Sequence, residues 1–275
     1  QLYDNGHEIV RDYGAARFLN VVAKEGGRYL PENESWAKQT VAHNALVVNG
    51  TSHFGGDADL ADRHAPRQLH FSSVPGLQLS SARIDTAYPE SPVAMQRTLA
   101  LVDVAGLASP VVIDVLRATG ETANTYDLPL HYAGHLIETG FVVNRELAGR
   151  PVLGNSHGYQ HIWVDGTARG QGNGAFMAWL LGGRFYSYRI SAQPDLQVIL
   201  GESGANDPAF NLRREPLVIQ RVEGAKETTF VSLLEPHGMS DGATEQTVDS
   251  QSLIASLRHR KHKGYDLVIV ETKSG

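Results

Sequence analysis

The chain has 275 residues, of which 41% are hydrophobic and 20% charged, as is typical of a globular protein with a sizeable core. Its net charge of −6 disfavours nucleic-acid binding, and no apolar run reaches the roughly 20 residues that a membrane-spanning helix needs. The absence of cysteine excludes disulfides and thiolate metal sites, so any metal must be held by His, Asp, Glu or backbone oxygens.

The first residues read as a strand running into the turn signal Asp4-Asn5-Gly6. They lack the basic start, apolar stretch and cleavage site of a signal peptide. The chain is therefore expected to begin in the middle of a larger structure.

Residues 14–35 carry glycines, a proline and aromatic residues but no sustained strand pattern. A loop of this length in a compact domain is usually functional or disordered, and its aromatic and arginine content argues against disorder. Basic residues also gather near the start of the chain, where residues 11–28 have a local excess of two positive charges that suits a polyanionic substrate. The charged residues counted are Arg11, Arg17, Lys24 and Arg28 against Asp12 and Glu25.

From about residue 38 onward, short β-branched or aromatic runs alternate with Gly, Pro, Asn and Asp clusters. Turn signals at Asn49-Gly50 and Gly182-Gly183 separate some of these runs. Many strands, few helices and no repeat period predict an all-β fold, a large antiparallel β-sandwich, with residues 1–275 forming one domain. The predicted strands cover residues 7–10, 40–48, 78–83, 97–102, 111–116, 126–132, 160–164, 176–181, 184–190, 196–200, 217–222, 228–233, 252–257 and 266–271.

Asp12 and His43 are the first candidate site residues, because one follows the predicted strand 7–10 and the other lies in the predicted strand 40–48. A carboxylate and an imidazole on neighbouring strands supply two ligands that zinc accepts, with room for a third. On spacing alone, a buried histidine hydrogen-bonded to an aspartate is the commoner arrangement.

Tyr29 and Arg17 on the long loop are the second candidates. A tyrosine can give a proton to an alkoxide-like leaving group, and an arginine fork binds a uronate carboxylate at two points. On composition alone, an exposed loop arginine and a tyrosine packed by its ring with its hydroxyl in water are the favoured interpretation.

The remaining histidines favour structural explanations. His131 and His135 lie four apart and share a face only if one strand continues through both. The basic stretch around His259 and His262 is typical of a solvated face.

Several stretches together resemble one family, the heparinase II/III-like polysaccharide lyases, and most closely the oligoalginate lyases of polysaccharide lyase family 17. The resemblance extends through nearly the whole chain. It is carried by Leu2-Tyr3-Asp4-Asn5-Gly6-His7-Glu8, Arg11-Asp12-Tyr13-Gly14-Ala15-Ala16-Arg17-Phe18, the run from Trp36 to Val48, Ala87-Tyr88-Pro89, Met95-Gln96-Arg97-Thr98-Leu99-Ala100, Tyr126-Asp127-Leu128-Pro129 and Ala205-Asn206-Asp207-Pro208.

The resemblance implies an N-terminal α/α toroid followed by a C-terminal β-sandwich, with the substrate cleft between them. It also implies a structural zinc ion, for which Asp12 and His43 match two ligands. The third ligand, a second histidine, would lie just before Gln1. Tyr29 matches a catalytic tyrosine that reaches into the cleft, and Arg17 matches an arginine that grips the substrate. The family's other catalytic groups lie on the toroid and have no counterpart in this sequence.

The resemblance therefore predicts the sandwich part of a lyase that cleaves uronate-containing alginate oligosaccharides by β-elimination, in the periplasm or outside the cell. The toroid is the expected partner; neither nucleic acid nor a membrane is. Two alternatives stay open: a non-catalytic carbohydrate-binding or structural sandwich, and a lyase for heparin-like glycosaminoglycans.

Overall fold

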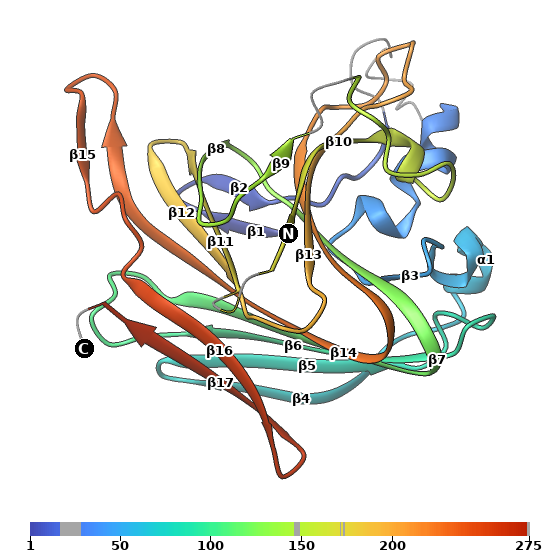
Figure 1. The fold of residues 1–275 in the computed structure, drawn as a ribbon, viewed down its shortest axis with the longest axis horizontal. Helices are drawn as coiled ribbons and strands as arrows, with labels where there is room; N and C mark the ends of the chain where they lie inside the picture. Colours follow the sequence, from blue (N-terminus) through green and yellow to red (C-terminus); the bar gives the residue numbers. More distant parts are fainter. Residues whose placement is uncertain (17–28, 146–148, 171, 173, 274–275) are drawn as a thin grey trace.

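The computed structural model of the chain describes residues 1–16, 29–145, 149–170, 172 and 174–273, and these form a mostly antiparallel β structure (Figure 1). The strands are β1 (Leu2–Asp4), β2 (His7–Val10), β3 (Val47–Val48), β4 (Arg67–Val74), β5 (Leu77–Ile84), β6 (Val93–Val102), β7 (Val111–His131), β8 (His135–Thr139), β9 (Asn144–Arg145), β10 (Ile162–Arg169), β11 (Ala175–Leu181), β12 (Arg184–Ile190), β13 (Gln197–Ser203), β14 (Pro216–Asp241), β15 (Gln246–Val248), β16 (Ile254–His262) and β17 (Tyr265–Thr272). The helical segments are η2 (Asn33–Ala37), η3 (Thr40–Ala42), η4 (His53–Gly56), α1 (Ala58–Ala61) and η5 (Tyr159–His161).

One large sheet contains most of these strands. Its main path runs β4-β5-β6-β7-β14-β12-β11-β8, with β13 and β10 continuing from the other part of β14. All the pairings recorded between described strands are antiparallel. The predicted all-β antiparallel fold is therefore confirmed.

The sheet folds over a core, as a sandwich requires. Tyr132, at the end of β7, has its ring 5.0 Å from that of Trp179 on β11, although β14 and β12 separate β7 from β11 in the sheet. Side chains of β6, β7, β10, β11, β12, β13 and β14 join the same buried cluster. This contact shows that the end of β7 and strand β11 lie on opposite sides of one core.

Strand β14 is the central element because it is buried on both faces. Val218 and Phe230 point into the central core. Ile219, on the other face, packs against the helical segments η2 and η3, and Val231, also on that face, packs against the β16–β17 hairpin. This alternation, with a period of two residues, shows why a single strand of 26 residues supports three hydrophobic clusters.

Three predicted turns are confirmed by left-handed backbone angles. Asn5 and Gly6 join β1 to β2, Gly182 and Gly183 join β11 to β12, and Asn49 with Gly50 closes a bridge between Val48 and Thr51. Two consecutive positive φ angles are the geometry that tight hairpins require.

The predicted strand 40–48 is wrong over most of its length. Thr40–Ala42 form a turn of 3-10 helix, and only Val47–Val48 pair as strand β3. Val41 and Ala42 are buried in a cluster that joins η2 to strands β10, β13 and β14, so their hydrophobicity reflects burial in the core and not a strand of their own. Among the described helices, none has the length and apolar character needed to span a bilayer.

Candidate functional site

The segment that carries Asp12 continues from β2 and is attached to the end of β7. Val10 bridges Tyr132, and the backbone N–H of Arg11 donates to the carbonyl of His131 at 2.9 Å. The guanidinium of Arg11 also donates to Glu215 at 2.9 Å. These contacts fix the backbone immediately before Asp12.

His43 is placed by the end of the 3-10 turn η3, where its backbone becomes extended. The next residue, Asn44, bridges the two neighbouring segments with its side chain. Its amide nitrogen donates to the carbonyl of Arg11 at 2.6 Å, and its amide oxygen accepts from the backbone N–H of His131 at 2.7 Å. Asn44 therefore holds His43 beside the segment of Asp12.

Asp12 and His43 are in direct contact, Oδ1 of the carboxylate against Nδ1 of the ring, and both side chains are partly exposed. Nε2 of His43 lies 3.0 Å from the carbonyl oxygen of Ala37. Because that oxygen only accepts, Nε2 carries a proton, and in a neutral ring Nδ1 would turn a lone pair toward the carboxylate. A proton or a cation shared by the two groups is therefore needed to make the contact attractive.

A buried ionic network lies behind this pair. Glu215 is buried and accepts from both Arg11 and Arg213, the latter at 2.8 Å. Arg213 also lies over the ring of Tyr13, 4.3 Å from its centroid, and its backbone N–H donates to the Tyr13 hydroxyl. Burial raises the pKa of Tyr13 to about 12, although Arg213 counters part of this effect. Glu215 and Arg213 thus fix both neighbours of Asp12, Arg11 and Tyr13.

A cavity of about 320 Å³ opens beside the pair. Asp12 and His43 line it together with apolar side chains of β6, β7 and β14. Arg97 also lines it, but its guanidinium forms a two-point ion pair with Asp114, at 3.0 and 2.6 Å. Burial alone would lower the pKa of Arg97, and Asp114 outweighs this effect and raises it. Arg97 therefore stays protonated, and the carboxylate of Asp114 balances its positive charge.

His131 and His135 do not form a site, because β7 ends at His131 and His135 begins the separate strand β8. His131 is buried, and its Nε2 lies 2.9 Å from the carbonyl oxygen of Val41. Burial lowers the pKa of His131, which keeps its ring neutral. His135 is exposed. His131 therefore has the structural role that the sequence favoured, and it does not pair with His135.

Of the two loop candidates, Tyr29 and Arg17, the structure describes only Tyr29. Tyr29 is an exposed residue with 66% of its surface accessible, and it does not line the cavity beside Asp12 and His43. Arg17 lies outside the described residues. Asn33 links the described residues on either side of 17–28. Its side-chain oxygen accepts from the backbone N–H of Ala16 at 3.0 Å, and its backbone N–H donates to the carbonyl of Leu30.

Asp12 and His43 are the types of ligand that zinc uses, but two ligands are fewer than a zinc site needs. A carboxylate and a neutral imidazole are both common zinc ligands, and zinc sites use three or four protein ligands. Within the described ranges, no group of three or more His, Cys, Asp or Glu side chains is placed to hold a metal ion. Asp12 and His43 can therefore supply only part of such a site.

Asn44 and Arg97 are structural parts of this site that the sequence did not single out. Both belong to stretches that carry the family resemblance, yet an isolated asparagine or arginine does not reveal which distant backbone it bonds. Asn44 bridges residues 33 and 87 positions away, which only the folded chain brings together.

Residues 1–246 match the family of heparinase II/III-like C-terminal domains. An alginate lyase of Stenotrophomonas maltophilia (strain K279a) is 49% identical over 271 residues, which is 98% of this chain and 36% of the relative. An exo-oligoalginate lyase of Saccharophagus degradans is 47% identical over 277 residues, covering 100% of this chain and 37% of the relative. The chain thus spans little more than a third of the length of these curated relatives.

Solved structures with this fold include the heparan sulfate lyase HepC from Pedobacter heparinus, with a TM-score of 0.55 at 11% identity over 97% of this chain and 35% of that protein. A heparinase III gene product gives a TM-score of 0.57 at 9% identity, over 98% of this chain and 35% of that protein. At such low identity these likenesses establish the fold alone.

Proposed function

Because the chain belongs to the heparinase II/III-like C-terminal family, we propose that it supplies the β-sandwich part of a lyase that cleaves alginate oligosaccharides. The observation that carries the proposal is the near-half identity to an alginate lyase and an exo-oligoalginate lyase along essentially the whole chain. The direct contact of Asp12 with His43 beside a cavity supports it, since these are the two residues that the family resemblance predicts as metal ligands.

The proposed reaction is a β-elimination on a uronate. A base removes the proton at C5, the electron pair forms the C4–C5 double bond, and the bond from C4 to the glycosidic oxygen breaks. The leaving oxygen takes a proton, so the products are a shortened oligosaccharide and an unsaturated uronate. Neutralising the substrate carboxylate makes the C5 proton more acidic and stabilises the developing negative charge.

Two residues of this chain are assigned to that reaction. Tyr29 delivers or positions the proton at the leaving oxygen, a role for which an exposed tyrosine on a long loop is suited. Arg17 grips a uronate carboxylate. The remaining catalytic groups belong to an α/α toroid that faces the sandwich in the full-length protein, and the much greater length of the relatives is consistent with such a partner.

Replacing Tyr29 with Phe in the full-length protein tests the assignment. Positioned proton transfer contributes about 10²- to 10⁴-fold, so the rate of formation of the ultraviolet-absorbing unsaturated product should fall by at least ~100-fold. Tyr265→Phe is the control, because this tyrosine is also exposed but lies at the start of β17. Unchanged turnover in Tyr29→Phe would remove this residue from the mechanism.

Substrate preference needs a separate assay. Alginate, heparan sulfate and hyaluronan should be offered in parallel, and unsaturated product is expected from alginate alone. Product from heparan sulfate would favour a glycosaminoglycan lyase instead. Oligosaccharide retention without any product, in the full-length protein, would favour a non-catalytic binding module.

Asp12 and His43 would serve as two ligands of a structural zinc ion, with a histidine from before residue 1 as the third. When bound, zinc would tie the segment after β2 to the turn after η3. His43→Ala in the full-length protein is expected to lower both the zinc content by elemental analysis and the melting temperature. His262→Ala, at an exposed position of β16, should change neither. Full zinc content in His43→Ala would overturn the metal assignment.

A further inference from the structure

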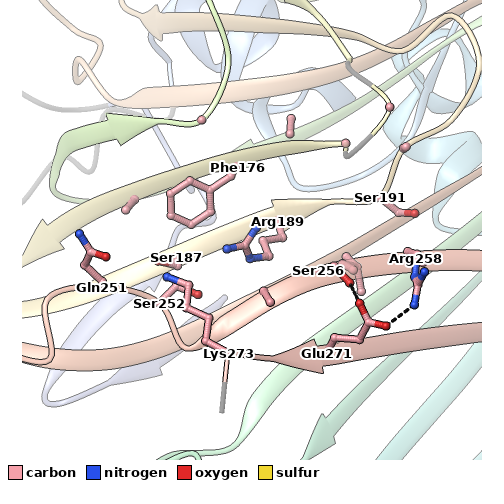
Figure 2. Close-up of a pocket in the computed structure, with 18 of the residues that line it drawn as sticks. Phe176, Ser187, Arg189, Ser191, Gln251, Ser252, Ser256, Arg258, Glu271 and Lys273 are labelled. Atoms are coloured by element: carbon pink, nitrogen blue, oxygen red, sulfur yellow. Dashed lines mark hydrogen bonds and ion pairs between the residues drawn. The ribbon is translucent and has the colours of Figure 1, made fainter. Parts of the chain in front are cut away.

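A second cleft, of about 740 Å³, lies between strands β11 and β12 and the β16–β17 hairpin (Figure 2). It is on the opposite face of β12 from the cavity beside Asp12 and His43. Tyr188 lines that cavity, whereas Ser187 and Arg189 line the cleft. The two cavities share no lining residue, so a ligand in one does not touch the other.

Arg189 lies in this cleft with Phe176, its cross-strand partner on β11 (Figure 2). The guanidinium carbon is 4.5 Å from the centre of the Phe176 ring. Nε of Arg189 is buried, and among the described residues it has no hydrogen-bond partner. The planar fork is therefore held in one orientation by the ring, with donor capacity unused.

The carboxylates near Arg189 do not neutralise it. Glu138 is exposed, and Glu235 and Glu271 accept hydrogen bonds from other residues. Glu235 is buried and accepts from the hydroxyl of Ser252 and from the backbone N–H of Leu253, the latter at 3.1 Å. Glu271 is engaged by Ser256 and Arg258 (Figure 2). In the part of the chain that the structure describes, no carboxylate is within ion-pair distance of Arg189.

The electrostatic consequence is that Arg189 lacks compensation for its burial. Burial lowers the pKa of Arg189, and Glu235 and Glu138 offset only part of that effect. An anion in the cleft would complete the compensation. Arg260 and Lys273 also line the cleft and add positive charge, on a chain whose net charge is −6.

We propose that this cleft is a second carbohydrate site, in which Arg189 binds the carboxylate of a uronate residue. Serine and glutamine side chains of the wall, among them Ser191 and Gln251, provide donors and acceptors for sugar hydroxyls. The volume is within the range of roughly 300–1,000 Å³ that small-molecule pockets occupy. That the anion is a uronate rests on the proposed function, whereas the anion site itself rests on Arg189 and its surroundings.

Calorimetric titration of the chain with an unsulfated uronate trisaccharide tests the site, with a neutral glucose trisaccharide and sodium sulfate as comparison ligands. Arg189→Met should weaken uronate binding at one site about tenfold or more, because a two-point charge-assisted contact is lost. Arg169→Met is the matched control, since this exposed arginine of β10 does not line the cleft. The neutral sugar should bind neither variant.

Each other outcome counts against the proposal. Unchanged uronate binding in Arg189→Met overturns the site, whether or not the full-length protein cleaves alginate. Sulfate binding as tight as that of the trisaccharide reduces the cleft to an anion site with no sugar recognition. If Arg189→Met does not melt cooperatively, Lys273→Met replaces it, because this exposed lysine is not part of the core. It should weaken uronate binding several-fold, and an unchanged affinity overturns the site.

Lyase assays separate this site from the catalytic one. In the full-length protein, Arg189→Met should raise the KM for long alginate chains without changing kcat on a trisaccharide. An equal loss of kcat on both substrates would mean that Arg189 acts through the fold, and would overturn its role in binding.

Discussion

At the scale of single residues, Asn44 decides whether Asp12 and His43 meet. Its amide satisfies the carbonyl of Arg11 and the N–H of His131 at once. Asn44→Ala removes both partners, and leaving buried polar groups unpaired costs about 1–3 kcal/mol each. We therefore expect a lower free energy of unfolding, measured by denaturant titration, and a lower zinc affinity in the full-length protein.

Asn49 is the matched control for this prediction. It too bridges with its side chain, accepting from Thr125 N–H at 2.9 Å and donating to Asn124 at 2.8 Å, but it lies away from the Asp12–His43 pair. Asn49→Ala should lose stability yet keep the zinc affinity. If Asn44→Ala also keeps it, Asn44 is a stabilising residue only and does not position the site.

The sequence predicted Asp12 and His43 as a pair, and the structure brings them into contact. Their local motifs were enough for this, because each motif marks the residue whichever element carries it. The element of His43 was not predicted correctly, since Val41 and Ala42 lie in a 3-10 turn that packs with Trp36 in the second core cluster, and only Val47–Val48 pair as a strand. Periodicity over so short a run does not distinguish these two environments.

At the scale of elements, the two longest strands were each predicted as two. Strand β7 was divided into 111–116 and 126–132, and β14 into 217–222 and 228–233. The register of β14 against β7 shifts between Val222 and Glu227, where Gly224 has a positive φ. A glycine within a strand pattern can mark a bulge as readily as a strand end. Only pairing with a distant partner shows that the strand continues.

Gly134, between β7 and β8, is a stricter requirement than Gly224. Both have positive φ, which costs an L-residue about 1–2 kcal/mol. A Cβ at Gly134 would also lie 2.4 Å from the carbonyl oxygen of Leu180, whereas one at Gly224 meets nothing within 4 Å. Gly134→Ala should therefore lose about 1–3 kcal/mol more stability than Gly224→Ala in denaturant titrations. Equal losses would show that backbone strain alone matters at Gly134.

At the scale of the whole molecule, the predicted strands were sufficient to identify the fold class. They did not show how the sheet curves around its core. The aromatic run 184–190, which follows the turn signal Gly182-Gly183, predicted β12 at its observed bounds. That Tyr132 then contacts Trp179 across the core follows from the curvature of the entire sheet, which no local pattern encodes. The cleft at Arg189 was missed for the same reason, because its walls come from strands about 70 to 80 residues apart in sequence.

Burial of tyrosines makes the whole fold sensitive to alkaline pH. Burial raises the pKa of seven of the ten tyrosines: Tyr13, Tyr88, Tyr126, Tyr132, Tyr159, Tyr186 and Tyr188. In the unfolded chain these phenols ionise near pH 10, so above that pH the unfolded state has lost protons that the native state keeps. Stability is therefore present in full below about pH 10 and falls as the pH rises toward 12, the pKa of Tyr13. The melting temperature should drop steeply across that interval, and phenolate absorbance of these residues should rise only on unfolding.

The same titration in denaturant, where all ten tyrosines are exposed, is the control. A native titration curve that coincides with the curve in denaturant, at constant melting temperature, would contradict the prediction.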